Sequence, residues 1–159
     1  HFSPPKGDNS VSAAPNTVRL HRVIRCPGEH LYRAFLDPVA KVKWLPPHGF
    51  VGAVQYSDTR VGGRYHMSFT NFRTGQAHSF GGTFTELTPG QRIRYTDKFD
   101  DPNLPGEMQV TVTFRPVSCG TELSILQENI PAEIPVELCY LGWQESLSLL
   151  ALLVEPEIL

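Results

Sequence analysis

The segment 130–159, IPAEIPVELCYLGWQESLSLLALLVEPEIL, decides the fold of this chain. Apolar side chains recur along it at spacings of three and four residues, so they share one stripe of a helix. The stripe comprises Val136, Tyr140, Trp143, Leu147, Leu150 and Val154. Pro131 and Pro135 fall where a first helical turn tolerates proline, because the N–H groups there have no partner. The segment therefore predicts one long amphipathic helix, about 30 Å of which would cross an entire curved sheet.

A series of strands precedes this helix. Period-two alternation predicts six of them, at about 51–58, 64–71, 78–87, 92–99, 107–115 and 121–128. Short turns between consecutive strands imply an antiparallel meander. Gly81 and Gly82 lie inside the third of these strands and predict a bulge or a strong bend. Because a bent sheet cannot lie flush against a straight helix, we expect space to remain between them.

The N-terminal part adds one strand and two short helices. Alternation over 17–25 predicts a strand, Pro27 opens a helix that ends at Asp37-Pro38, and a short helical turn then leads to Trp44. Residues 1–16 are rich in Pro, Ser, Gly and Ala, and we expect them to form a flexible leader outside the fold. The prediction is a single α+β domain over 17–159.

Composition and charge exclude several classes of function. The chain has 159 residues, 40% hydrophobic and 19% charged, with 14 basic and 16 acidic side chains and a net charge of −2. No basic run or basic face is present, which argues against nucleic acid and against an anionic membrane surface. Polar residues interrupt the apolar stretches of the last helix, which argues against a membrane span. Three scattered cysteines, Cys26, Cys119 and Cys139, fit a reducing compartment. We therefore expect a soluble, cytoplasmic protein.

Four local segments resemble a known family. They are WLPPHGF (44–50), DTRVGGRY (58–65), GGTFTELTPG running on to RIRYT (81–96), and LGWQESL (141–147). Their order and the order of predicted elements resemble the START-like, or SRPBCC, helix-grip superfamily. Within it they are similar to the branch named for the activator of the heat-shock-protein-90 ATPase. The resemblance covers about Thr17 to Val154.

The resemblance implies a helix-grip fold, in which a bent antiparallel sheet and two short helices hold a long C-terminal helix over the concave face. It implies no shared catalytic residues. The eukaryotic co-chaperone of the family carries a separate N-terminal domain that does much of the chaperone binding, whereas a sixteen-residue leader stands in that place here. We therefore do not expect this chain to bind the chaperone.

Nine side chains are predicted to line a cavity between sheet and helix. Most are aromatic and fall on the inner rows of the strands or on the helix stripe, where they fit cavity lining and core packing alike. They are Trp44, Tyr65, Met67, Phe69, Phe84, Tyr95, Asp97, Tyr140 and Trp143. Of the two tryptophans, Trp143 is placed at the centre of the gripping helix, so Trp143→Ala is expected to change ligand affinity more than Trp44→Ala.

Asp97 stands out among these residues because a carboxylate falls on an apolar strand face. Burying it without partners costs several kcal/mol. One interpretation makes Asp97 a polar anchor that orients a ligand in an apolar pocket. The other places it at a frayed strand end near Asp100 and Asp101, where it turns to solvent.

Metal, cofactor and nucleophile signals are absent from the sequence. His66 and His78 would lie several residue pairs apart in the predicted hairpin, and no acidic or cysteine side chain completes a site at ligand spacing. Both histidines fall on outer-face positions. No phosphate-cradling loop or nucleophile motif is present. We therefore predict no metal, no cofactor and no catalytic residue that a motif would identify.

The function predicted from these observations is binding of a small hydrophobic or amphipathic, lipid-like molecule in the cavity. An aromatase/cyclase-like enzyme is the first alternative, and it predicts a polar cluster inside the cavity with a strongly perturbed pKa. A co-chaperone or other protein-interaction domain is the second, and it predicts a filled core and an exposed apolar patch. Leu141, Leu149 and Leu152 mark where that patch, or a homodimer contact, would lie.

Overall fold

A computed structural model describes residues 10–11 and 16–158. Eight strands and three helices follow one another within them. They are β1 (Ser10–Val11), β2 (Val18–Ile24), α1 (Gly28–Leu36), α2 (Pro38–Trp44), β3 (Phe50–Ser57), β4 (Arg64–Asn71), β5 (Ala77–Thr88), β6 (Arg92–Phe99), β7 (Met108–Val117), β8 (Gly120–Glu128) and α3 (Val136–Val154).

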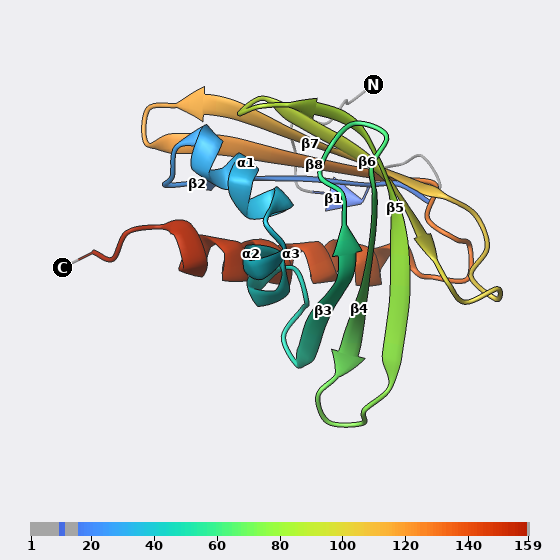
Figure 1. Cartoon of the computed structure of the whole chain (residues 1–159). Coiled ribbons are helices and arrows are strands. Elements are labelled where there is room, and N and C mark those ends of the chain that lie inside the picture. The colour runs from blue at the N-terminus through green and yellow to red at the C-terminus, as the bar shows by residue number, and fades with distance from the viewer. Residues whose placement is uncertain (1–9, 12–15, 159) are drawn as a thin grey trace, which may run out of the picture.

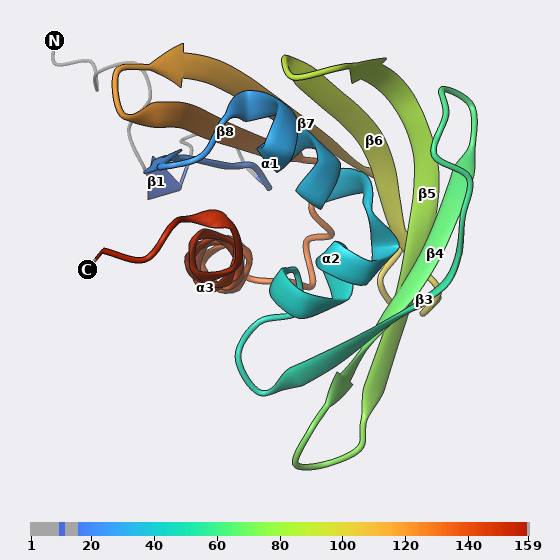
Figure 2. The ribbon, with the colours of Figure 1, turned by 60° about the vertical axis from the view of Figure 1, so that its left-hand side comes forward.

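All the strands join one antiparallel sheet in the order β1-β2-β8-β7-β6-β5-β4-β3. The sheet curls around α3, which Figure 2 shows end-on inside the curve. The helices α1 and α2 fill the space between the sheet and α3, with α1 against β7 and α2 between α3 and β3 (Figure 1). The predicted α+β class, the meander and the helix-grip arrangement are confirmed.

The long helix is shorter than predicted. It begins at Val136 with Pro135 as its N-cap, rather than at residue 130. A proline disfavours the helical conformation of the residue before it, so Pro135 holds Ile134 outside the helix. Pro156 acts in the same way on Glu155, whose extended backbone (φ −79°, ψ 142°) ends the helix. No helix in the described part of the chain is long and apolar enough to cross a membrane.

The predicted leader also contains an element of the sheet. Ser10 and Val11 form β1 and pair with Arg19 and Val18 of β2. The expectation that the whole of 1–16 lies outside the fold is therefore wrong for these two residues. The rest of the predicted leader, apart from Asn16, lies outside the described residues.

The core divides into two clusters. The larger one joins α1, α2 and α3 to β2, β7 and β8 and includes Trp44, Leu31, Leu123 and Leu147. The smaller one lies on β4 and β5 and comprises Tyr65, Met67, Phe80 and Phe84. Strands β3 to β5 diverge from α3 where the sheet bends (Figure 2).

The bend depends on a close approach of two backbones at Gly82. A Cβ atom built there would overlap the carbonyl oxygen of Thr96 on β6, so only glycine fits. The neighbouring amide of Thr83 donates to the side-chain oxygen of Thr96 (2.9 Å) rather than following the regular ladder. The register between β5 and β6 then shifts between Phe84 and Glu86. The bend predicted from the glycine pair is thus a local break in the pairing of β5 with β6.

Candidate functional site

A cavity of about 250 Å³ lies where the two core clusters meet. The sheet side is formed by β4, β5 and β6, through Tyr65, Met67, Phe69, His78, Phe80, Tyr95, Asp97 and Phe99. The first half of α3 forms the opposite side, through Leu138, Cys139, Gly142, Trp143 and Ser146. The remaining wall comes from Lys41, Leu45, Pro47, Met108 and Gln127. Exposed Leu138 and His78 mark the opening to solvent.

A polar cluster occupies one end of this mainly apolar cavity. The hydroxyl of Tyr65 donates to Asp97 Oδ1 (3.1 Å) or to the carbonyl oxygen of Thr96 (2.9 Å). The ammonium nitrogen of Lys41 lies 4.9 Å from the centre of the Tyr65 ring, within the range of a cation–π contact. The Tyr95 ring meets that of Tyr65 edge to face, with centroids 5.8 Å apart. Asp97 and Tyr95 are each partly exposed, and both line the cavity.

Burial dominates the electrostatics of this cluster. It raises the pKa of Asp97 to about 7, against the opposing effects of the Tyr65 hydrogen bond and the positive charge of Lys41. It lowers the pKa of Lys41 to about 8, although Asp97 opposes that change. It also raises the pKa of Tyr65 and of Tyr95, with the charge of Asp97 acting in the same direction, so both phenols stay protonated. Two groups of the cavity thus titrate near neutral pH.

The helix side of the cavity is fixed by hydrogen bonds to the strands and to α2. Trp143 Nε1 donates to Gln127 Oε1 (2.9 Å), and Gln127 Nε2 approaches the sulfur of Met108 (3.3 Å). Ser146 Oγ donates to the carbonyl oxygen of Leu45 just after α2 (2.6 Å). Burial raises the pKa of Cys139 to about 11, so this thiol is neutral and a poor nucleophile at pH 7. The helix side is therefore positioned without supplying a reactive group of its own.

Six of the nine predicted site residues line the cavity: Tyr65, Met67, Phe69, Tyr95, Asp97 and Trp143. The other three lie away from it. Trp44 is buried in the larger cluster, where it contacts Phe35 and donates to the carbonyl oxygen of Ala34 (2.9 Å). Phe84 is buried in the smaller cluster and does not line the cavity. Tyr140 is on the outer margin of α3, where its hydroxyl accepts from Gln144 (3.1 Å).

The sequence reasoning missed Lys41 and Gln127. Lys41 lies three residues before Trp44 in α2, so the two side chains share the buried face of that short helix. The inward position of Trp44 was the signal that could have placed Lys41 as well. Gln127 occupies an inner position of β8, in register with Leu123 and Ile125. The signal that could have placed Gln127 inside was its position in a strand whose residues alternate between the two faces of the sheet.

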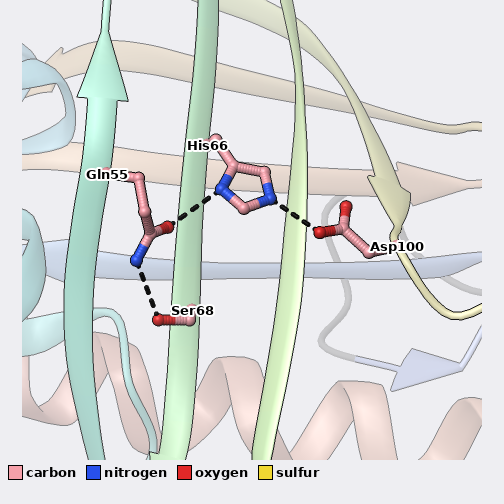
Figure 3. Close-up of polar contacts among 4 residues, drawn as sticks. All are labelled: Gln55, His66, Ser68 and Asp100. Atoms are coloured by element: carbon pink, nitrogen blue, oxygen red, sulfur yellow. Dashed lines mark hydrogen bonds and ion pairs between the residues drawn. The ribbon is translucent and has the colours of Figure 1, made fainter.

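A second polar cluster lies on the opposite, convex face of the sheet (Figure 3). His66 Nδ1 contacts Gln55 Oε1 (3.0 Å) and His66 Nε2 contacts Asp100 Oδ2 (2.8 Å). Gln55 in turn donates to Ser68 Oγ (3.1 Å). The cluster connects β3, β4 and the end of β6 on the surface away from α3. It holds the sheet together there and does not reach the cavity.

The two histidines considered as metal ligands are separated by the sheet itself. His66 pairs with Gly81 and His78 with Phe69, so the expectation that both histidines take outer-face positions is wrong for His78. His78 lies at the cavity opening and His66 in the convex cluster. Within residues 10–11 and 16–158, no group of three His, Cys, Asp or Glu side chains is placed to hold a metal ion.

A curled antiparallel sheet that grips a long C-terminal helix over an internal cavity defines the helix-grip class, the START-like or SRPBCC superfamily. Residues 25–155 match the family described as Activator of Hsp90 ATPase homolog 1-like protein. The chain belongs to this family.

Solved structures of related proteins have the same fold. A crystal structure of a protein from Chromobacterium violaceum is 62% identical, with a TM-score of 0.89 over 90% of this chain and 99% of that one. An AHSA1 protein from Silicibacter pomeroyi is 24% identical, with a TM-score of 0.74 over 86% and 95%. A protein from Mycobacterium smegmatis is 18% identical, with a TM-score of 0.80 over 98% and 100%. No curated protein matches the chain.

Proposed function

We propose that this protein binds a small hydrophobic or amphipathic molecule in the cavity under α3 and shields it from water. The observation that carries the proposal is the combination of an apolar cavity of about 250 Å³ with a few polar groups at one end. Pockets that bind small molecules have this composition, since apolar walls supply affinity and a few polar groups set the orientation.

The apolar wall supplies the driving force. Met67, Phe80, Met108 and Trp143 all line the cavity. Each Å² of ligand surface that they remove from water is worth about 25 cal/mol. Thioether and aromatic side chains also adapt to ligands of different outline, because methionine is flexible and polarizable. The wall therefore favours a compact apolar body over a polar metabolite.

The first test is native mass spectrometry of the purified protein, with intact and denatured masses compared. We expect a discrete additional mass that leaves on denaturation, or, for an empty protein, uptake of 4-phenylbutan-1-ol or 4-phenylbutanoate measured by calorimetry. Gly142→Leu is the variant that blocks the cavity, because Gly142 lines it and a Cβ atom there meets only Pro47 at 4.0 Å. Gly142→Ala is the matched control, since it adds one methyl group and leaves most of the space.

Two outcomes would contradict the proposal. One is an empty protein that takes up neither compound. The other is binding that survives Gly142→Leu unchanged while that variant remains folded by circular dichroism, because the compounds would then bind elsewhere.

An enzyme that uses the same cavity is the second candidate, and the polar cluster favours it. Lys41 and Asp97 have pKa values of about 8 and 7 as a result of burial, so each can exchange a proton with a bound molecule near neutral pH. Proton abstraction next to a carbonyl is the simplest such reaction. Incubating the protein with 4-phenylbutan-2-one in D₂O tests it: exchange of the α-protons faster than in buffer, and lost in Asp97→Asn, would support an enzyme.

A protein-interaction domain receives less support. That alternative predicts a filled core, whereas the core here encloses a cavity. Of the three leucines named for a docking patch, Leu149 packs partly against the core, while Leu141 and Leu152 are exposed. A homodimer through those two side chains stays a prediction, which sedimentation of the protein and of Leu141→Ser would test.

A further inference from the structure

Lys41 presents a charged group to the cavity that has no hydrogen-bond or ion-pair partner among the described residues. The side chain is 9% exposed, and it lines the cavity wall. Its ammonium group makes no hydrogen bond and no ion pair with any residue of the described chain, beyond its contact with the Tyr65 ring. The ammonium nitrogen is not among the fully buried unpaired atoms of the described residues, so its free donors can be reached from the cavity. An acceptor on a bound ligand could hydrogen-bond to it at this point.

Tyr95 supplies a second donor in the same cavity. Its hydroxyl has no hydrogen-bond partner among the described residues, although its neighbour Tyr65 is fully engaged with Asp97 and Thr96. The phenol remains protonated, because burial raises its pKa. A buried tyrosine hydroxyl usually finds a partner. Lys41 and Tyr95 thus both offer donors to the cavity that no described residue occupies.

Asp97 does not occupy these donors. It forms no ion pair with Lys41 in the described structure, and its Oδ1 is taken by the Tyr65 hydroxyl. Its pKa is about 7, so it can accept a proton and lose its charge when another anion enters the cavity. An incoming anion therefore meets a positive Lys41 and an aspartate that need not repel it.

We propose that the ligand of this cavity is a small monocarboxylate with an apolar body, whose carboxylate accepts hydrogen bonds from the Lys41 ammonium and the Tyr95 hydroxyl. The apolar body lies against Met67, Phe80 and Met108. This inference rests on the proposed binding function and adds the chemical class of the ligand.

The test uses three compounds of one shape: 4-phenylbutanoate, 4-phenylbutan-1-ol and 4-phenylbutylamine. Their affinities for the full chain are measured by calorimetry at pH 7. A hydrogen bond to a charged group contributes about 1.5–3 kcal/mol, which corresponds to roughly ten- to a hundredfold in affinity. We expect the carboxylate to bind at least tenfold more tightly than the alcohol, and the amine to bind most weakly.

Variants assign this preference to the two donors. Lys41→Met keeps the length of the side chain and is expected to lower carboxylate affinity at least tenfold while leaving alcohol affinity within threefold. Lys43→Met is the matched control, because Lys43 is two residues away on the exposed face of α2 and is expected to change neither affinity. Tyr95→Phe removes one hydroxyl and is expected to cost the carboxylate about two- to tenfold. It also keeps the test valid if Lys41→Met fails to fold.

The outcomes separate the two proposals. Equal binding of carboxylate and alcohol, tightest binding of the amine, or a carboxylate preference that survives both Lys41→Met and Tyr95→Phe would overturn the carboxylate assignment and leave a binding cavity. Failure of all three compounds to bind would overturn both.

Discussion

Two polar clusters lie back to back on the same strand, and they differ in almost every physical respect. Tyr65 and His66 are neighbours on β4, but their side chains point to opposite faces of the sheet. Tyr65 joins Asp97 and Lys41 inside the concave face. His66 joins Asp100 on the convex face, where the side chains are 24% and 56% exposed.

The difference shows that surroundings, rather than residue type, decide what a carboxylate does in this fold. Each cluster contains an aspartate of the β6 region and a nitrogen-containing side chain. Water screens the convex pair, so it contributes little energy. Protein surrounds the concave group, so Asp97 and Lys41 are both pushed toward their neutral forms. The convex cluster therefore connects strands, whereas the concave cluster lines a cavity in which its groups could contact a ligand.

The largest effect is expected where the concave cluster depends on backbone geometry. Gly82→Val would drive its side chain into the Thr96 carbonyl group, which accepts the Tyr65 hydroxyl. We expect a loss of more than about 3 kcal/mol in the free energy of unfolding, measured by urea denaturation. Gly142→Ala on the helix side should instead gain about 0.5–1 kcal/mol, because alanine favours a helix interior over glycine. Equal stabilities for the two variants would contradict the close approach at Gly82.

The next effect is a pH dependence that only the concave aspartate should show. The pKa of Asp97 is about 7 in the folded protein and near 3.8 in the unfolded chain. Between these values the folded state holds a proton that the unfolded state has released. The free energy of unfolding should therefore fall as the pH rises from 4 to 7, by about 3 kcal/mol relative to Asp97→Asn. Urea denaturation of both proteins at pH 5 and pH 7.5 measures this difference.

Lys41 should have the opposite effect at higher pH, where it makes the free energy of unfolding rise with pH. Its pKa is about 8 in the folded protein and 10.5 in the unfolded chain, so the unfolded state binds the extra proton between these values and stability rises with pH there. Asp100→Asn is the convex control: it leaves Asp97 and Lys41 in place, so the fall and the rise assigned to these two groups should both remain. If Asp100→Asn removed the fall in unfolding free energy between pH 4 and 7, or Asp97→Asn kept it, the assignment of this fall to Asp97 would be wrong.

A smaller effect separates the two tryptophans. Trp143→Phe removes the donor to Gln127 in the cavity wall, which should cost about 1 kcal/mol and change 4-phenylbutanoate affinity severalfold. Trp44→Phe removes the donor to Ala34 in the packed core and should cost a similar or larger amount of stability with affinity unchanged. Calorimetry and urea denaturation of the two variants make the comparison. Unchanged affinity in Trp143→Phe would remove this residue from the binding wall.

The smallest effect belongs to the convex cluster itself. His66→Ala breaks contacts to Asp100 and Gln55 that are exposed to solvent. We expect a loss of less than about 1 kcal/mol in the free energy of unfolding, reduced further in 1 M salt, and no change in ligand affinity. A loss of binding in this variant would show that the two faces of the sheet are coupled.

Periodicity was sufficient to predict the architecture, because each element has one wet face and one dry face. Two pairs of residues are buried as their spacing predicts: Val110 and Val112 on β7, and Leu147 and Leu150 on α3. Element ends were harder to place, since they depend on single prolines: Pro135 and Pro156 bound a helix that the apolar pattern alone extends at both ends. The strand β1 was missed because two residues are too short to show a period.

Periodicity predicted the candidate site only in part. It separates buried from exposed positions, but it does not distinguish residues that line the cavity from residues packed in the core. Trp44 and Trp143 both face inward, yet one packs tightly and the other borders space that the bend in β5 creates. That space depends on how several strands curve together, which no local pattern contains. Lys41 was missed for a different reason: hydropathy places lysine outside, and only the packing of α2 brings it in.

The pairing of β2 with β8 also sets the order in which the chain can assemble. Val18 pairs with Gln127, more than one hundred residues later, whereas β3 through β7 each pair with the next strand in sequence. During synthesis the meander can form as it emerges, but β2 must wait for its partner, since so distant a contact carries the entropy of closing a long loop. The helix α3 emerges after all of the strands. The sheet side of the cavity can therefore form first, and the cavity is enclosed only after the segment of α3 from Leu138 to Ser146 has emerged.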